Sequence, residues 1–219
     1  MTVSLLITMS LFALAASLSP GPVNLVSLSG SARYGLKTGL TFVTGATLGF
    51  IVLFLLIGFG LRYFINALPW LTQFIQWLGI AFLLYLSYQL FMDNGELDPN
   101  NDKHAPTFMT GAVMQWLNPK AWLASVSGIS AYIPQAKVDE VLIFAGLYMP
   151  ICWLSLGVWV GVGIVLGQYF QSPNKMRFMN KSLATLLAGS CFIPVSLEAA
   201  ALLAALTHPN HLVRLSSWG

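Results

Sequence analysis

The chain has 219 residues, of which 57% are hydrophobic and only 8% are charged, and its mean hydropathy is +0.75. Because a soluble domain carries roughly a quarter charged residues, this composition indicates an integral membrane protein and excludes a cytosolic enzyme. The formal net charge of +3 is too small for the concentrated basic surface that nucleic-acid binding needs. Six spans of about 20 residues use roughly 120 residues, so the length fits six helices joined by short loops.

The apolar segments are long enough to cross a bilayer, and short polar connections separate them. They cover approximately residues 3–28, 38–61, 68–92, 107–132, 141–170 and 183–206. Alternating ten-residue strands, which are typical of a transmembrane barrel, do not occur. The predicted fold class is therefore all-α and integral to the membrane.

The first apolar segment contains a helix break, Ser19-Pro20-Gly21-Pro22, and Asn24 follows it. Proline lacks a backbone donor and clashes with the preceding turn, whereas glycine permits unusual dihedral angles. A serine directly before a proline is also a pattern that starts helices. The sequence therefore predicts that one helix stops here and a second one begins inside the membrane.

The fourth apolar segment contains a matching break at Asn118-Pro119-Lys120. At 1.5 Å per residue this break lies near mid-membrane, whereas the boundaries 3–28 put the first break deeper. Irregular backbone at this depth needs protein or a water-filled cavity around it, and the N–H groups of a helix start attract an anion such as a carboxylate. Two proline kinks with packing roles are the alternative. The matched breaks, one beside a lysine, favour a binding site.

Glycines recur at corresponding places in the two halves, at spacings that let helix backbones approach closely. They include Gly45, Gly49, Gly157, Gly161, Gly163 and Gly167, and we expect most of them to be packing positions. The correspondence predicts that residues 107–206 form a second three-helix repeat after residues 1–92, separated by a cytoplasmic loop at residues 93–106 and followed by a tail at residues 207–219. Because each repeat has an odd number of spans, the two repeats have inverted topology.

Several stretches of the chain resemble the LysE/RhtB family of amino-acid exporters, which belongs to the LysE superfamily. They are residues 19–24, the glycine-rich second segment through Gly49, residues 78–86 and residues 111–121. The resemblance implies six spans in two inverted repeats with the first and fourth helices broken, and secondary export of an amino acid or derivative from bacteria across the inner membrane. It also implies proton coupling. Phe50 stands where many members carry an acid, which weakens the assignment of an acidic proton carrier.

The predicted substrate site consists of the two breaks, on which the family's Pro-Gly-Pro-x-Asn and Asn-Pro-Lys motifs fall. Its residues are Ser19, Pro20, Gly21, Pro22, Asn24, Asn118, Pro119 and Lys120. We predict no catalytic residue, no metal and no cofactor. The expected partners are an amino-acid substrate, the lipid bilayer and a coupling proton but no nucleic acid, and a homodimer is compatible with so small a transporter.

Two of these residues have alternative roles. Asn24 can offer its amide to the substrate or can bond the carbonyl groups that the prolines leave free. A lysine at the depth of Lys120 costs roughly 2.5–3.5 kcal/mol on insertion scales and is expected to face a cavity or a partner, with snorkelling as the alternative. Lys120 can then pair with the substrate carboxylate or take up and release the coupling proton.

Two other functions within the superfamily are alternatives. An intramembrane thiol–disulfide carrier needs reactive cysteine pairs in the broken helices, but Cys152 and Cys191 both lie elsewhere, in apolar runs without a partner. A metal exporter needs a ligand cluster, and the first five segments contain no such group of His, Asp and Glu. The three histidines (His104, His208 and His211) lie in a loop and in the tail. Both alternatives are therefore weaker than amino-acid export.

Basic residues are distributed unequally between the two sides of a six-span arrangement. Six of them share the connections after spans 1, 3 and 5 (Arg33, Lys37, Lys103, Lys175, Arg177 and Lys181), and three lie on the other side (Arg62, Lys137 and Arg214). Since cytoplasmic loops are enriched in Lys and Arg, both termini are predicted to lie outside the cytoplasm.

Reporter fusions test this topology. A fusion after Asp98 is expected to give a cytoplasmic signal, and a fusion at the C-terminus an external one, because the basic connections stay inside. The opposite pair of signals would invert the orientation.

Overall fold

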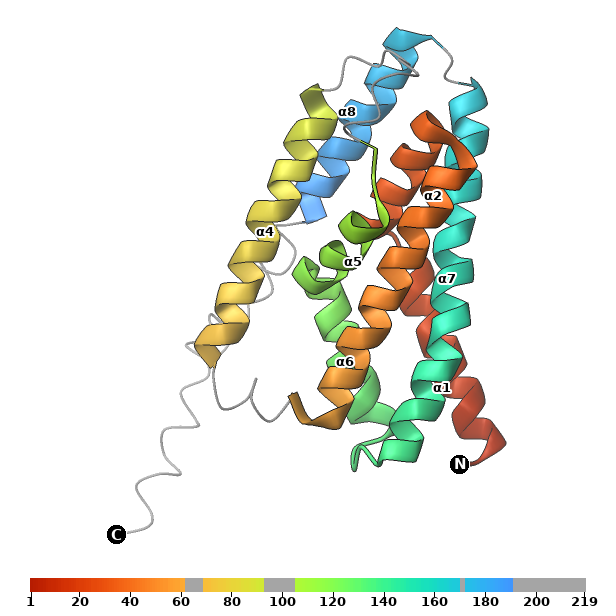
Figure 1. Cartoon of the computed structure of the whole chain (residues 1–219), viewed down its shortest axis with the longest axis vertical. Coiled ribbons are helices and arrows are strands. Elements are labelled where there is room, and N and C mark those ends of the chain that lie inside the picture. The colour runs from red at the N-terminus through yellow and green to blue at the C-terminus, as the bar shows by residue number, and fades with distance from the viewer. Residues whose placement is uncertain (62–68, 93–104, 170–171, 191–219) are drawn as a thin grey trace, which may run out of the picture.

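The computed structural model describes residues 1–61, 69–92, 105–169 and 172–190, and every regular element in these ranges is helical (Figure 1). In chain order they are α1 (Val3–Leu18), α2 (Pro22–Leu56), the π-helix η1 (Ile57–Leu61), α4 (Pro69–Met92), α5 (Phe108–Leu117), α6 (Pro119–Tyr132), α7 (Val138–Tyr169) and α8 (Pro173–Ser190). Two helical stretches are long and apolar enough to cross a membrane, Pro22–Gly60 and Val138–Tyr169. The all-α class is confirmed for this part of the chain.

The helix that follows the first break is longer than predicted. The segment boundary at residue 28 is wrong, because the helical conformation continues to a kink at Gly35, where φ is +82°. Serines do not end the helix here, since Ser27 and Ser31 donate hydrogen bonds back to the carbonyl groups of Val23 and Ser27. The extension moves the first break toward the middle of its span and removes the mismatch in depth with the second break.

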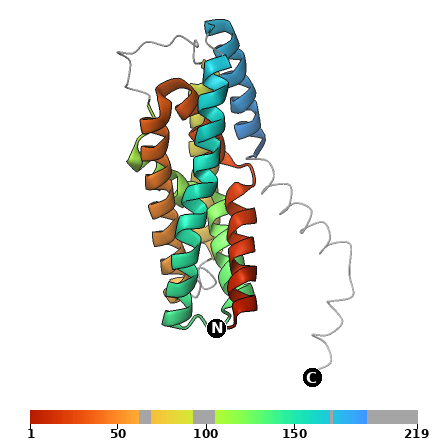
Figure 2. The same cartoon turned by 90° about the vertical axis from the view of Figure 1, so that its right-hand side faces the viewer.

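At Gly35 the chain turns back, and α2 continues in the opposite direction (Figure 2). A Cβ atom on Gly39 would lie 2.9 Å from the Cβ atom of Ser31, which shows how closely the two arms of α2 approach. This turn lies at the end of the bundle opposite to the N-terminus (Figure 1). A positive φ favours glycine, so Gly35 makes the tight reversal possible.

Helix α8 begins earlier than the predicted sixth segment, whose start at residue 183 is wrong. Lys175, Arg177 and Lys181 were expected in a connection but lie on this helix. Lys175 and Arg177 are exposed, while five apolar side chains of the helix are buried (Met176, Met179, Leu183, Ala184 and Leu187). A mean-hydropathy criterion misses such a helix because its two faces cancel.

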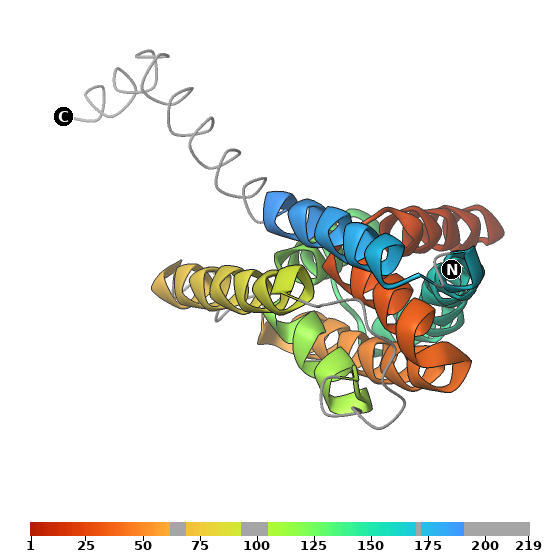
Figure 3. The same cartoon turned by 90° about the horizontal axis from the view of Figure 1, so that it is seen from above.

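Helices α4 and α8 form a pair at one edge of the bundle, whereas α2 packs against α7 and α5 (Figures 1 and 3). The Ser87 hydroxyl of α4 donates to the Ala184 carbonyl of α8 at 2.8 Å. The first broken span, α1 with the start of α2, and the second, α5 with α6, run in opposite directions (Figure 1). The described residues do not include most of the loop at 93–106, residues 191–206 or the tail. Lys103, His104 and Cys191 therefore lie outside them. The six-span inverted repeat and its boundaries stay predictions.

The glycine pairs divide into packed and open positions. Gly45 and Gly49 lie against the backbone of α5, and a Cβ atom on Gly49 would come within 2.7 Å of the Ala112 Cα atom. The same prediction is wrong for Gly157 and Gly161, where an added Cβ atom would meet nothing within 4 Å.

On α7 the packed pair is instead Gly163 and Gly167, which meet the backbone of α2 at Leu28 and Ala32. Residues six positions apart lie about two-thirds of a turn apart on a helix. The two glycine pairs of α7 have the same internal spacing but lie on different faces of the helix. The spacing alone therefore does not tell which pair is packed.

Substitution of these glycines tests the packing. Gly49→Leu is expected to lower the free energy of unfolding by about 1–3 kcal/mol, because the side chain would force α2 and α5 apart. Gly161→Leu is the matched control and is expected to leave it unchanged. Thermal unfolding in detergent measures both, and equal stability of the two variants would show that α2 and α5 do not meet at Gly49.

Candidate substrate site

The second break is built as the sequence predicts. Asn118 ends α5 and caps α6, and its side-chain oxygen accepts a hydrogen bond from the Lys120 backbone N–H at 3.1 Å. Pro119 occupies the first position of α6, where its missing N–H leaves no intrahelical bond unmade. The Trp122 indole N–H donates to the Trp116 carbonyl at 2.7 Å and satisfies one of the groups that the end of α5 leaves free.

The first break differs from the predicted arrangement. Ser19 does not cap a new helix; it ends α1, and its hydroxyl donates back to the Ala16 carbonyl. The second helix begins at Pro22, with Gly21 as its N-cap. Since Pro22 is the proline at the first helical position, Pro20 lies in the linker between the helices, and the serine–proline pattern was assigned to the wrong proline.

The carbonyl groups at the end of α1 receive donors from three other helices. The Asn24 amide of α2 donates to the Ser17 carbonyl at 2.9 Å, and the Trp159 indole of α7 donates to the Leu18 carbonyl at 3.2 Å. The Lys120 ammonium of α6 donates to the Ser19 carbonyl at 2.6 Å. A helix end leaves such groups without intrahelical donors, so these contacts join α2, α6 and α7 to one point.

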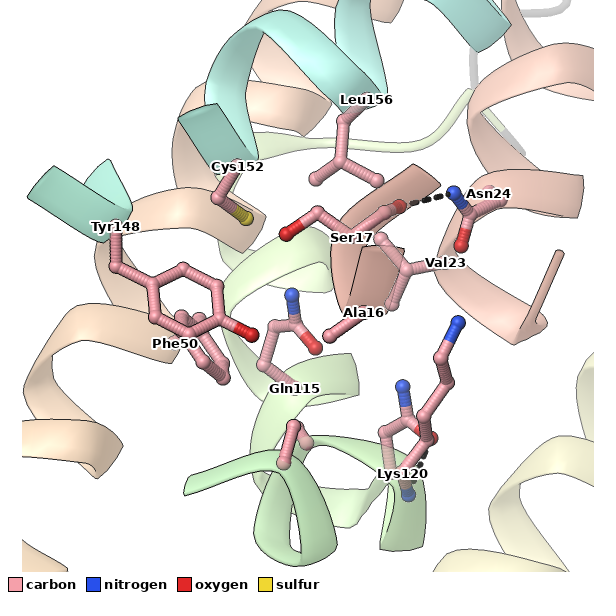
Figure 4. A pocket seen from close by; sticks show the side chains of 13 residues that line it. Ala16, Ser17, Val23, Asn24, Phe50, Gln115, Lys120, Tyr148, Cys152 and Leu156 are labelled. Carbon is pink, nitrogen blue, oxygen red and sulfur yellow. Dashed lines mark hydrogen bonds between the residues drawn. The ribbon is translucent and has the colours of Figure 1, made fainter. Parts of the chain in front are cut away.

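Lys120 therefore connects the two breaks directly. Its Nζ atom also lies 3.5 Å from the Pro20 carbonyl. A Cβ atom at position 21 would stand 3.2 Å from Nζ, so Gly21 leaves room for the ammonium group. The lysine points toward the α1–α2 break instead of extending along its helix to the membrane surface (Figure 4), which argues against snorkelling.

A cavity of about 40 Å³ lies between the breaks and α7. Lys120 and Asn24 lie on one side of it, Tyr148 and Cys152 lie on the other, and Gln115 lies between them (Figure 4). Typical ligand pockets measure about 300–1,000 Å³, so the cavity in this state holds only a few water molecules.

Three predicted site residues line this cavity: Asn24, Asn118 and Lys120. The other five lie around it without lining it. The Ser19 and Pro20 carbonyl groups accept hydrogen bonds from Lys120, and Gly21 leaves space for the lysine side chain. Pro22 and Pro119 each occupy the first position of a helix.

Sequence reasoning missed four polar lining residues: Ser17, Gln115, Tyr148 and Cys152. Ser17 and Gln115 lie within three residues of a break, and a polar side chain so placed inside an apolar run is a usable signal. Tyr148 and Cys152 lie one helical turn apart on α7 and gave no local signal. Cys152 is buried and also faces the cavity.

Aromatic side chains close the cavity toward the N-terminal end of the bundle, where α6 ends and α7 begins. The cluster consists of Phe12, Phe50, Phe54, Tyr132, Phe144 and Tyr148. Phe50 also lines the cavity and packs against Tyr148 in a tilted arrangement, with ring centroids 4.6 Å apart. The position at which the family resemblance would place an acid is thus part of an apolar seal.

Long apolar helices and two breaks that meet beside a small cavity define a helical bundle of the discontinuous-helix kind, which is a common plan of membrane transporters. The sequence model of the LysE type translocator family matches residues 14–201, and the chain belongs to this family. It is accordingly a transport protein of the bacterial inner membrane and not an enzyme.

The curated relatives are similar over most of their length. The cysteine/O-acetylserine efflux protein of Salmonella typhimurium (strain LT2) is 26% identical over 166 residues, which cover 72% of this chain and 84% of that protein. The protein of the same name from Escherichia coli O1:K1 is 25% identical over the same coverage. A comparison with solved structures found no match.

The contact between Asn24 and Ser17 can be tested by substitution. Asn24→Ala is expected to lower the free energy of unfolding by about 1–3 kcal/mol, because the partly buried Ser17 carbonyl loses its donor. Asn174→Ala on α8, where the side chain is exposed, is the control. Equal melting temperatures for the two variants would contradict a capping role for Asn24.

Proposed function

We propose that the chain is a secondary-active exporter of a small, uncharged-side-chain amino acid or amino-acid derivative, driven by exchange with protons. The observation that carries this proposal is the Lys120 ammonium group, which lies between the two helix breaks at the edge of a small cavity lined by polar and apolar side chains. The printed names of the relatives, which are efflux proteins for cysteine and O-acetylserine, support the same substrate class.

The charge around the cavity supports a zwitterionic substrate. Lys120 is the one charged side chain among the described residues that line it, and none of them is acidic. A substrate carboxylate would face this ammonium and the positive end of α6, which begins one residue before Lys120. A second positive charge, as on a basic amino acid, would find no counter-charge there.

The proton exchange is assigned to Lys120 because no other charged side chain is present among the described residues that line the cavity. Phe50 fills the place at which the resemblance would put an acid, and the described lining offers no carboxylate to replace it. An amine that alternates between the Ser19 carbonyl and the substrate can exchange a proton when the cavity opens.

No specific observation supports either alternative function, the thiol–disulfide carrier or the metal exporter. Cys152 is the only cysteine among the described residues, and its side chain lies 4.0 Å from the Thr47 hydroxyl instead of a second thiol. The described part of the chain also contains no group of three or more metal-ligating side chains.

The proposed orientation places both termini outside the cytoplasm. The kink in α2 and the start of α8 lie at the end of the bundle opposite to the N-terminus (Figure 2). The basic residues of these two elements therefore share one end, as the topology requires.

Transport by Lys120 variants tests the proposed function. In everted vesicles with a proton gradient, the wild type is expected to take up at least one small neutral amino acid from a panel of all twenty and O-acetylserine. Lys120→Met is expected to insert normally and to lose this uptake, because the charge that attracts the carboxylate is gone. Lys175→Met, which removes an exposed lysine of α8, is the control.

Lys120→Arg separates the two roles of the lysine. Restored uptake would mean that a fixed charge suffices, and loss of uptake would mean that titration or the shape of the ammonium is required. Uptake at the wild-type rate by Lys120→Met would exclude the residue from the site.

A further inference from the structure

We propose that the Ser19 and Pro20 carbonyl groups are the binding subsite for the substrate's ammonium group, and that Lys120 occupies this subsite when no substrate is bound. The inference rests on the proposed function, because it names the place of one substrate group. It also assigns Lys120 a second state, as a tethered substitute for the ligand.

The two carbonyl groups that Lys120 contacts differ from the others at the end of α1 in the type of donor they receive. Of the long-range donors at the end of α1, the Asn24 amide and the Trp159 indole are neutral, and each serves one carbonyl group. The Ser19 and Pro20 carbonyl groups instead share one cation. This pair is therefore built for a positive charge, and the negative end of the α1 dipole adds to the attraction.

The ammonium group of an amino acid matches the group that Lys120 places at the two carbonyl groups. A lysine side chain ends in a primary ammonium group with three donors, and an amino acid carries the same group on its α-carbon. A substrate ammonium can replace Nζ at 2.6 Å from the Ser19 carbonyl without loss of a hydrogen bond. Gly21 keeps the required space open, since a Cβ atom there would stand 3.1 Å from Lys120 Cδ and 3.2 Å from Nζ.

The contact of Lys120 with the first break also links the two halves of the chain. Lys120 belongs to the second half of the chain, and its partners belong to the first half, so the contact joins the two halves beside a cavity of only about 40 Å³. A substrate ammonium that takes over the two carbonyl groups would release this link. The freed Lys120 would then be next to the substrate carboxylate, so that one exchange both binds the ligand and removes this contact between the halves.

The experiment uses the purified full chain in detergent and methylammonium chloride as the probe. In Lys120→Met the two carbonyl groups lack their cation, and methylammonium is expected to raise the melting temperature with a saturable dose dependence. The wild type is expected to respond at least about tenfold more weakly, since its own ammonium competes and a charge-assisted hydrogen bond is worth roughly that factor. Tetramethylammonium, which has the charge but no N–H group, is expected to have no effect at equal ionic strength.

Lys175→Met is the variant control and should behave as the wild type does. If Lys120→Met does not fold, Lys120→Gln replaces it. An equal response of wild type and variant, an equal response to tetramethylammonium, or no response of the variant would each overturn the inference. Because the assay needs no transport, a positive result together with no amino-acid uptake by the wild type would refute the proposed function and leave the ammonium subsite standing.

Discussion

The carbonyl groups that the first break leaves without helical donors organise this bundle. In a hydrocarbon surrounding, an unsatisfied backbone group costs several kcal/mol, so each one requires a donor from elsewhere in the protein. Here the donors are Asn24, Lys120 and Trp159, which come from three different helices. A purely local event, the end of α1, thereby fixes where α2, α6 and α7 converge.

The cavity lies at this convergence, and the contacts on its two sides differ in kind. On one side α7 meets α2 through glycine contacts, and the Ser31 hydroxyl donates to the Val160 carbonyl at 3.0 Å. On the other side the seal is made of aromatic rings around Tyr148. Backbone contacts of the first kind separate only if helices move apart, whereas aromatic contacts can change by side-chain rotation. The two sides of the cavity therefore differ in the kind of motion that would separate their contacts.

The errors in the sequence-based expectations share one cause. The polar side chains that follow residue 28 predict the end of a span there, but Ser31 bonds back to its own helix. The basic side chains that precede residue 183 predict the start of a span there, but Arg177 lies on the exposed face of a helix that also buries Met176. In both places the average polarity of a segment hid which way each side chain points.

The sequence by itself determined the membrane class, the positions of the two breaks and the cap at Asn118, because these depend on composition and on contacts between near neighbours in the chain. Only the tertiary structure decided that Lys120 reaches the Ser19 carbonyl, that Tyr148 and Cys152 face the same cavity, and that Gly163 is packed while Gly161 is open. These outcomes depend on the rotation of one helix relative to another. A single sequence states the spacing along a helix but not the direction of its neighbour, and that direction is set by packing across the whole bundle.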